Sequence, residues 1–224
     1  MIRRGDLLAW TDARKTDLIH FAFRSEEVNT PQPALILASG SPRRRELLEK
    51  LGVTFKVVTA DVVELDAVSA PKLKPTDLAI ENARLKAAAV AKLPEAAGCW
   101  VLGADTVVVQ NDHLYGKPAT LAEAKKFLRT FRGCTHEVIT GGVLRNPAGA
   151  EKGFFDVSCV VFRDFPDATI DRYLAEVHVL DKAGGYALQE HGNWLIERVK
   201  GSEANVIGFP VEVVERLLKS SGLL

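Results

Sequence analysis

Three consecutive arginines, at positions 43 to 45, directly follow the segment ASGSP (residues 38–42). This segment predicts a tight turn and the start of a helix, so the arginines fall in the first helical turn. Cations are unfavourable there by roughly 0.3–1 kcal/mol each, because a helix N-terminus already carries partial positive charge. The free N–H groups of that turn and the guanidinium groups would instead suit the oxygens of a phosphate. The alternative is that the arginines are solvated or pair with acids of their own helix. The predicted polyanion site consists of Ser39, Ser41, Arg43 and Arg44.

Two carboxylates are candidates for a divalent cation beside such a phosphate. Asp105 lies in the apolar stretch GADTVV, where a carboxylate is costly unless it is paired, solvated or bound to a metal. Glu64 ends a second predicted strand, and carboxylate oxygens are suitable ligands for a hard divalent cation. The alternatives are that Asp105 caps a turn and that Glu64 is an ordinary surface acid.

Several other polar side chains are weaker candidates. Lys117 in YGKPAT precedes a helix on a rigid Gly-Pro turn, Lys86 lies within a helical pattern and Lys182 lies in LDKAGG. Lysines are more often solvated than catalytic, so none of them is decisive alone. Gln189 in YALQ has an amide that can read the edge of a base, and His136 is expected to be structural. The sequence contains no GxxxxGK[ST], GxGxxG or HExxH motif.

Alternating strand and helix patterns without a repeat predict the elements that must position these residues. The expected fold class is α/β with a mixed sheet. Ser41 is expected to cap the first helix, the T-x-x-E box at residues 120–123 the third, and Asp167 the fourth. Strands are expected at 34–38, 54–64, 99–110 (as a pair or one bent strand), 136–146 and 154–164, a twisted ribbon at 184–201, and helices at 42–51, 76–93, 120–133, 167–177 and 209–222.

Composition limits the function classes. Lys plus Arg and Asp plus Glu number 29 each, and this balance argues against a broad nucleic-acid-binding face. No apolar run reaches the roughly 18–20 residues that span a bilayer, so no membrane association is expected. The cysteines are three in number and widely spaced; we expect reduced core residues in a cytoplasmic protein. Residues 1–33 lack a clean apolar segment, and we interpret them as an extension of unknown role preceding a single domain at 34–224.

Seven segments, in this order and spacing, resemble the Maf family of nucleoside triphosphate pyrophosphatases. The resemblance runs from about residue 34 to residue 220. It implies a strongly bent mixed sheet with flanking helices and two lobes around a central cleft, similar to the inosine triphosphate pyrophosphatases. The segments are LASGSPRRRELLEKLGVTF, VLGADTVVV, GKP, GCTHEVITGGVL, VVFRDF, LDKAGGYALQ and SEANVIGFP.

The resemblance also implies an activity and roles for individual residues. Members of the family hydrolyse the bond between the α and β phosphates of a nucleoside triphosphate with Mg²⁺ or Mn²⁺, and many are homodimers. Asp105 corresponds to the family's proton acceptor, and Asp105 and Glu64 lie near the metal; because this chain has DVVELD, Asp61 is the alternative to Glu64. The implied catalytic residues are Asp105, Glu64, Lys86 and Lys117, and the implied substrate-binding residues are Ser39, Ser41, Arg43, Arg44, Thr106 and Gln189.

Three of these positions indicate a subfamily. Relatives that prefer 7-methyl-GTP carry Trp, Gln and Glu where this chain has Arg43, Thr106 and Gln189, and the set found here resembles the group that acts on dTTP and UTP. A glutamine amide can both donate to and accept from a pyrimidine. We therefore expect a dTTP/UTP pyrophosphatase that releases NMP and pyrophosphate, with modified pyrimidine nucleotides as further candidates. The alternative is a nucleotide-binding regulator of cell division without turnover.

Overall fold

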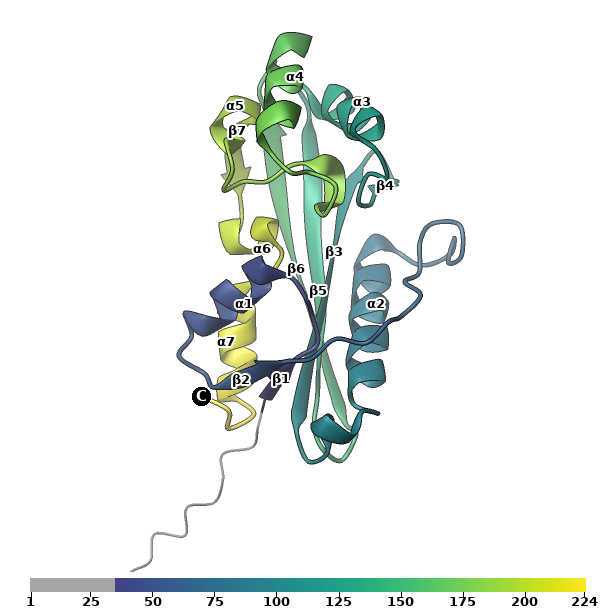
Figure 1. Ribbon diagram of the computed structural model, residues 1–224, viewed down its shortest axis with the longest axis vertical. Coiled ribbons are helices and arrows are strands. Elements are labelled where there is room, and N and C mark those ends of the chain that lie inside the picture. The colour runs from purple at the N-terminus through teal and green to yellow at the C-terminus, as the bar shows by residue number, and fades with distance from the viewer. Residues whose placement is uncertain (1–34) are drawn as a thin grey trace, which may run out of the picture. The chain divides into compact units, whose positions relative to one another are not determined.

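The computed structural model describes residues 35–224 and consists of one mixed sheet with helices on both faces (Figure 1). The sheet has seven strands in the order β2-β1-β3-β5-β6-β7, and β4 pairs with β3. β1 is parallel to β2 and β3, and the remaining pairs are antiparallel. The strands are β1 (Leu35–Leu37), β2 (Phe55–Val57), β3 (Trp100–Gln110), β4 (His113–Tyr115), β5 (Thr135–Arg145), β6 (Glu151–Phe162) and β7 (Ile196–Lys200).

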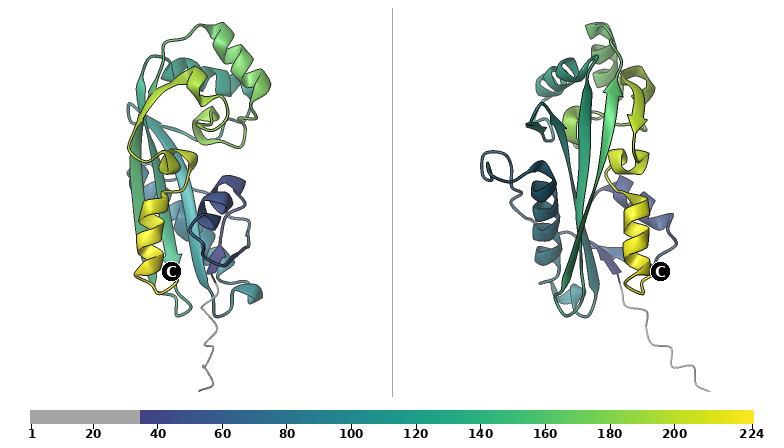
Figure 2. Two further views of the ribbon diagram at one scale, coloured as in Figure 1. Left: turned by 90° about the vertical axis from the view of Figure 1, so that its left-hand side faces the viewer. Right: turned by 180° about the vertical axis from the view of Figure 1, so that it is seen from behind.

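Helices cover the two faces of this sheet. In the right-hand view of Figure 2, α2 (blue) lies on one side of the sheet and α7 (yellow) on the other. The helices are α1 (Pro42–Glu49), α2 (Pro75–Val90), α3 (Leu121–Phe131), α4 (Asp167–Glu176), α5 (Gly192–Leu195), α6 (Glu203–Ile207) and α7 (Val211–Lys219). The expected mixed sheet with flanking helices is confirmed. No helix among residues 35–224 is long and apolar enough to cross a membrane.

The apolar side chains form two main cores along the sheet, and these define two lobes. The α3–α4 lobe, at the top of Figure 1, is built around the buried rings of Phe131, Phe162 and Tyr173. The α1–α7 lobe, lower in the same view, buries residues such as Leu48 and Phe209. Since each lobe has its own core, the long strands β3, β5 and β6 are what connect them.

The edge of β3 is open between the two lobes. β1 pairs with β3 only as far as Leu102, and β4 pairs with the same strand from Val108 onward. On its other side β3 pairs continuously with β5. Residues 103–107 therefore have no strand partner on this side, and Asp105 lies in the middle of this stretch.

Two glycines allow α2 to lie directly against the sheet beside Asp105. Gly141 of β5 is the register partner of Asp105, and a Cβ atom built on it would lie 2.5 Å from the Ile80 backbone nitrogen. A Cβ on Gly103 would lie 2.2 Å from the Ala83 carbonyl oxygen. Only residues without a side chain permit this approach, which brings α2 within hydrogen-bonding reach of Asp105.

Capping largely explains where the predicted helices begin. Ser41 accepts a hydrogen bond from the Arg44 N–H at 3.4 Å, and Thr120 accepts one from the Glu123 N–H at 3.2 Å. Both caps were expected from the sequence and are confirmed. The expected cap at Asp167 is wrong: Pro166 occupies the cap position, and Asp167 instead pairs with Arg129 and Arg132.

The predicted second strand is mostly absent. Only Phe55–Val57 pairs with β1, and residues 58–66 contain neither strand nor helix. The backbone of Leu65 is bound instead by the Asn82 side chain, through both its N–H and its carbonyl. A side chain distant in sequence thus replaces the ladder hydrogen bonds that this alternating segment would otherwise need.

The C-terminal third also differs from the prediction in detail. The expected ribbon at 184–201 becomes a strand only at Ile196, since the N–H and carbonyl of Ala187 bind the Tyr173 hydroxyl instead of a neighbouring strand. The helix α6 was not predicted. The three cysteines are free, as expected, but none of them is a core residue, because Cys99 and Cys159 are partly exposed and Cys134 is exposed. The division into an extension and one domain stays a prediction, and residues 1–33 lie outside the described residues.

Candidate active site

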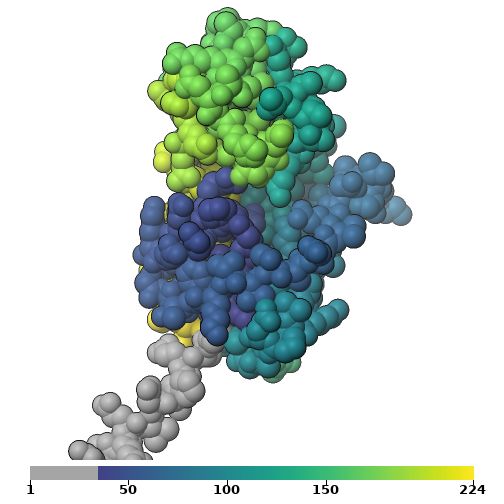
Figure 3. Space-filling model, in the orientation of Figure 1, coloured from purple at the N-terminus to yellow at the C-terminus, as the bar shows by residue number. Residues whose placement is uncertain are grey.

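A cavity of about 450 Å³ lies over the open edge of β3, between the two lobes. In Figure 3 the purple and blue surface of α1 and β2 lies beneath the green and yellow surface of the α3–α4 lobe. The cavity lining contains every site residue predicted from the sequence, namely Ser39, Ser41, Arg43, Arg44, Glu64, Lys86, Asp105, Thr106, Lys117 and Gln189. Tertiary structure thus brings together groups that lie up to 150 positions apart (189 − 39).

Asp105 is held on the side of β3 that faces α2. Its side chain is 10% exposed and accepts a hydrogen bond from the Lys86 ammonium at 2.6 Å. Its second oxygen accepts one from the Asn82 amide at 3.2 Å. The carboxylate is therefore paired and oriented, which offsets the cost of placing it in an apolar strand.

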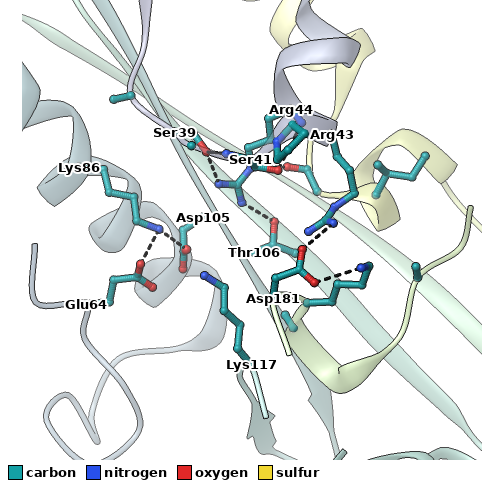
Figure 4. Close-up of a pocket in the computed structure, with 18 of the residues that line it drawn as sticks. Ser39, Ser41, Arg43, Arg44, Glu64, Lys86, Asp105, Thr106, Lys117 and Asp181 are labelled. Atoms are coloured by element: carbon teal, nitrogen blue, oxygen red, sulfur yellow. Dashed lines mark hydrogen bonds and ion pairs between the residues drawn. The ribbon is translucent and has the colours of Figure 1, made fainter. Parts of the chain in front are cut away.

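Lys86 connects Asp105 to the segment that follows β2. Its ammonium also lies 3.0 Å from a carboxylate oxygen of Glu64. Asp61 lines the same cavity, but among the described residues no ion pair joins it to Lys86. This geometry favours Glu64 over Asp61 as the second acid. Figure 4 shows the exposed Lys117 pointing toward the same space from the opposite side.

Arg44 is the centre of a hydrogen-bond network above β3 (Figure 4). Its guanidinium donates to the Gly208 carbonyl at 2.9 Å, the Ala104 carbonyl at 2.9 Å, Ser39 Oγ at 3.1 Å and Thr106 Oγ1 at 3.0 Å. Among residues 35–224 it forms no ion pair with a carboxylate. Burial lowers the pKa of Arg44, and the nearby charges of Asp105 and Glu64 oppose this shift. A partly desolvated cation without a carboxylate partner favours an anionic ligand.

Thr106 holds Arg44 in place. Consecutive strand residues face opposite sides, so Thr106 points away from the α2 side on which Asp105 lies. Its hydroxyl lies 3.0 Å from the Thr140 hydroxyl, which donates at 3.2 Å to the Asn205 carbonyl. Thr106 therefore donates to Thr140 and accepts from Arg44. Its hydroxyl is used within the protein, and its influence on a ligand passes through Arg44.

Arg43 reaches across the cavity to the α3–α4 lobe. It donates to Asp181 at 3.0 Å, and Asp181 also accepts from Lys182 at 3.0 Å. Burial acts to raise the pKa of Asp181, but the bonds from Lys182 and Arg43 together hold it below the usual value. Arg45 instead pairs with Glu49 on the surface, so only two of the three arginines face the cavity.

Gln189 and the two serines complete the predicted set. Ser39 is buried and accepts the Ser41 N–H at 3.3 Å, while Ser41 caps α1. Gln189 lines the cavity but is exposed, on the segment that follows Tyr186. His136 takes no part: it is buried between aromatic rings, bonds the Tyr186 hydroxyl at 2.7 Å, and burial lowers its pKa to about 3. Its predicted structural role is confirmed.

The carboxylates of the cavity fit a divalent cation that is bound partly by the protein and partly by the oxygens of a phosphate. Among the described residues no group of three His, Cys, Asp or Glu side chains surrounds a single point. A cage made by the protein alone is therefore absent there. Mg²⁺ typically binds one or two carboxylates together with substrate phosphates, and Glu64 and Asp105 provide such a pair on either side of Lys86.

Sequence reasoning missed two residues of the site. Asn82 precedes Lys86 by four positions, and this spacing places both on one face of α2. That spacing was the available signal, but nothing in the sequence indicated a partner for Asn82. Asp181 precedes the candidate Lys182 in the sequence, but no local pattern of residues indicated that an acid would lie in a phosphate site.

The arrangement is that of a hydrolase acting on phosphoric anhydrides: cations for a polyanion, beside an oriented carboxylate. The chain belongs to the Maf-like protein family, whose profile matches residues 34–221. The "dTTP/UTP pyrophosphatase" of Akkermansia muciniphila is 43% identical over 85% of this chain and 97% of its own length. The protein of the same name from Deinococcus radiodurans is 45% identical over 85% and 94%. The solved Staphylococcus aureus Ham1 protein aligns with 84% of this chain and 99% of its own, at 14% identity and a TM-score of 0.47.

Proposed function

We propose that this protein hydrolyses the bond between the α and β phosphates of dTTP and UTP, releasing dTMP or UMP and pyrophosphate. The names of relatives that match almost their full length support this substrate class. The observation that carries the proposal is the Asp105 carboxylate, held by Lys86 at 2.6 Å in the wall of a cavity that also contains Arg44 and Lys117.

The cations of the cavity bind the triphosphate. Arg44 and Lys117 offer donors to the phosphate oxygens, and Arg43 adds a guanidinium once it leaves Asp181. Four of the five N–H donors of Arg44 are already used within the protein, so Arg44 contributes mainly fixed positive charge and one remaining donor.

Asp105 acts on the attacking water. Its carboxylate orients the water and accepts its proton as the oxygen attacks the α phosphorus, and the bond from that phosphorus to the α–β bridging oxygen breaks. Lys86 holds the Asp105 carboxylate in position for this role. A divalent cation bound by Glu64, Asp105 and phosphate oxygens would supply neutralisation of the charge that develops on the leaving pyrophosphate.

Gln189 recognises the base. Its amide can donate to a pyrimidine carbonyl and accept from the N3–H of thymine or uracil. Cytosine presents the reverse pattern, an N3 acceptor beside a 4-amino donor. An amide oriented for thymine or uracil would meet two like groups there, and discrimination against cytosine is expected.

Product analysis tests this function. The purified chain is incubated with Mg²⁺ and dTTP, UTP, CTP, GTP or 7-methyl-GTP, and pyrophosphate and NMP are measured together. We expect equal amounts of both from dTTP and UTP, and a fall of about 10²–10⁴-fold in kcat for Asp105→Asn with nucleotide binding retained, since general-base catalysis contributes that much. Orthophosphate as product, or normal turnover of Asp105→Asn, would contradict the proposal. Saturable nucleotide binding without any product would favour the regulator of cell division.

Three further properties belong to the same proposal. We expect activity to require Mg²⁺ or Mn²⁺, the protein to form a homodimer, and the cytoplasm, where nucleotides are available, to be its location. Removal of divalent ions with EDTA should abolish pyrophosphate release, and adding back either ion should restore it. Analytical ultracentrifugation gives the oligomeric state directly, and a monomer at micromolar concentration would contradict the dimer.

A further inference from the structure

Asn82 joins the catalytic carboxylate to the loop that carries the second acid. It is a buried polar residue of α2, only 2% exposed. Its amide nitrogen donates to Asp105 Oδ2 at 3.2 Å and to the Leu65 carbonyl at 3.0 Å. Its amide oxygen accepts the Leu65 N–H at 2.7 Å. Both amide hydrogens and the oxygen are therefore in use.

The partners of Asn82 determine the orientation of its amide. A carboxylate oxygen of Asp105 can only accept, and the Leu65 N–H can only donate. The nitrogen must therefore face Asp105 and the oxygen must face the Leu65 N–H, and the reverse orientation would place two acceptors against each other. These contacts favour a single orientation of the Asn82 amide, because each lost hydrogen bond would leave a buried polar group unpaired.

Asn82 and Lys86 divide the two oxygens of Asp105 between them. Lys86 binds Oδ1 at 2.6 Å and Asn82 binds Oδ2 at 3.2 Å, one helical turn apart on α2. Two donors on different oxygens define the plane of the carboxylate, whereas a single donor leaves it able to rotate. A base must be held in a narrow range of orientations to meet its water.

The same side chain holds the segment between β2 and α2. Residues 58–66 have no strand or helix, and Leu65 directly follows Glu64. Both backbone groups of Leu65 bind Asn82, and Glu64 reaches Lys86 at 3.0 Å from this point. The position of the second acid relative to Asp105 therefore depends on Asn82.

We propose that Asn82 is a positioning residue of the reaction: it orients the Asp105 carboxylate and holds Glu64 within reach of Lys86. The inference rests on the proposed function. In this role Asn82 does not contact the substrate. Loss of its side chain should therefore reduce turnover more than nucleotide binding.

Kinetics of three variants and a control test this role. Asn82→Ala removes all three bonds, Asn82→Ser keeps one hydroxyl donor, and Asn82→Asp replaces both donors with acceptors beside Asp105. We expect kcat for dTTP to fall about 10- to 100-fold in Asn82→Ala, the range found for residues that orient a catalytic or metal-binding group, with little change in KM. Asn82→Ser should be intermediate and Asn82→Asp the slowest.

The control is Val214→Ala in α7, which removes buried apolar volume at a residue outside the cavity lining. All values are taken per folded molecule, with the folded fraction measured by thermal unfolding. If the Asn82 variants match Val214→Ala in kcat, the residue only stabilises the fold and the proposal is wrong.

Hydrogen exchange provides a readout that does not depend on turnover. The Leu65 amide should exchange faster in Asn82→Ala and Asn82→Ser than in the wild type, and at the wild-type rate in Val214→Ala. An unchanged Leu65 rate in the Asn82 variants would overturn the inference. If the wild type releases no pyrophosphate while Leu65 responds as expected, the proposed function fails and the link between α2 and the 58–66 segment stands.

Discussion

At the scale of single residues, the cavity contains one acid, Asp181, whose charge would oppose the binding of a phosphate. Asp181 occupies a cavity otherwise suited to phosphate, where its negative charge repels a polyanion. In the structure it neutralises Arg43 at 3.0 Å. Under the proposed function, nucleotide binding would exchange this ion pair for contacts between Arg43 and phosphate.

Asp181→Asn should tighten nucleotide binding. The amide keeps the shape and an acceptor for Lys182 but removes the negative charge and releases Arg43. We expect KM for dTTP to fall about two- to fivefold, the range for a partly exposed ion pair, with a larger effect at low salt. The control is Asp171→Asn. Asp171 is an exposed acid of α4 that pairs with Lys125 of α3, and its substitution should leave KM unchanged. A higher KM in Asp181→Asn would show that the acid supports binding.

At the scale of elements, the approach of α2 to the sheet places the side chains that contact Asp105. The helix lies on the sheet where Gly103 and Gly141 flank Asp105. Its alanines Ala79, Ala83 and Ala87 are fully buried against this surface. Small residues on both sides shorten the distance between helix and strand. Consequently the side chains of Asn82 and Lys86, although of different lengths, both reach Asp105.

Gly141→Ala should separate α2 from the sheet. The added methyl group would lie 2.5 Å from the Ile80 backbone nitrogen, so the helix has to move. We expect a loss of about 1–3 kcal/mol in the free energy of unfolding, as for other overpacked sites, and a lower kcat because Asn82 and Lys86 are displaced. Urea unfolding and pyrophosphate release measure the two effects.

Gly153→Ala on β6 is the matched control for that substitution. A Cβ there lies 3.6 Å from Ile80 Cγ2, an ordinary contact distance. It should leave both stability and turnover close to wild type. Equal behaviour of the two variants would mean that the close contact at Gly141 does not determine the position of α2.

At the scale of the whole molecule, stability depends on two cores that the same strands connect. His136 lies in the core of the α3–α4 lobe, stacked on Phe131 at a centroid distance of 4.3 Å. Burial lowers its pKa from 6.5 to about 3. Between these values the unfolded chain binds a proton that the folded chain does not. The contribution of the neutral His136 to the free energy of unfolding is complete above pH 6.5 and is lost as the pH falls toward 3.

His136 should therefore make the protein sensitive to mild acid. From pH 7.5 to pH 5 we expect it to account for a loss of about 2 kcal/mol in the free energy of unfolding. Replacing His136 and its partner Tyr186 together by Phe should remove this part of the pH dependence, as measured by urea unfolding at both pH values. The exposed His178→Asn serves as control and should behave as wild type. An unchanged pH dependence in the double variant would contradict the role of His136.

The sequence by itself determined the family, several of the local elements and most of the polar residues that line the cavity. α1, α3 and the hairpin of β5 and β6 were predictable because capping residues, periodicity and turn residues act within a few positions. The seven segments predicted the Maf-like family, which the family match confirms. The roles assigned to the individual site residues stay predictions.

Only the tertiary structure decided how these residues work together. It showed that residues 58–66 are held by Asn82 rather than by a strand, and that Arg43 meets Asp181 from 138 positions away. It also showed that Thr106 serves Arg44, and that two glycines admit α2 beside Asp105. The physical reason is common to all four: each depends on a hydrogen bond or a steric contact with a distant segment, and no local pattern of residues encodes such a partner.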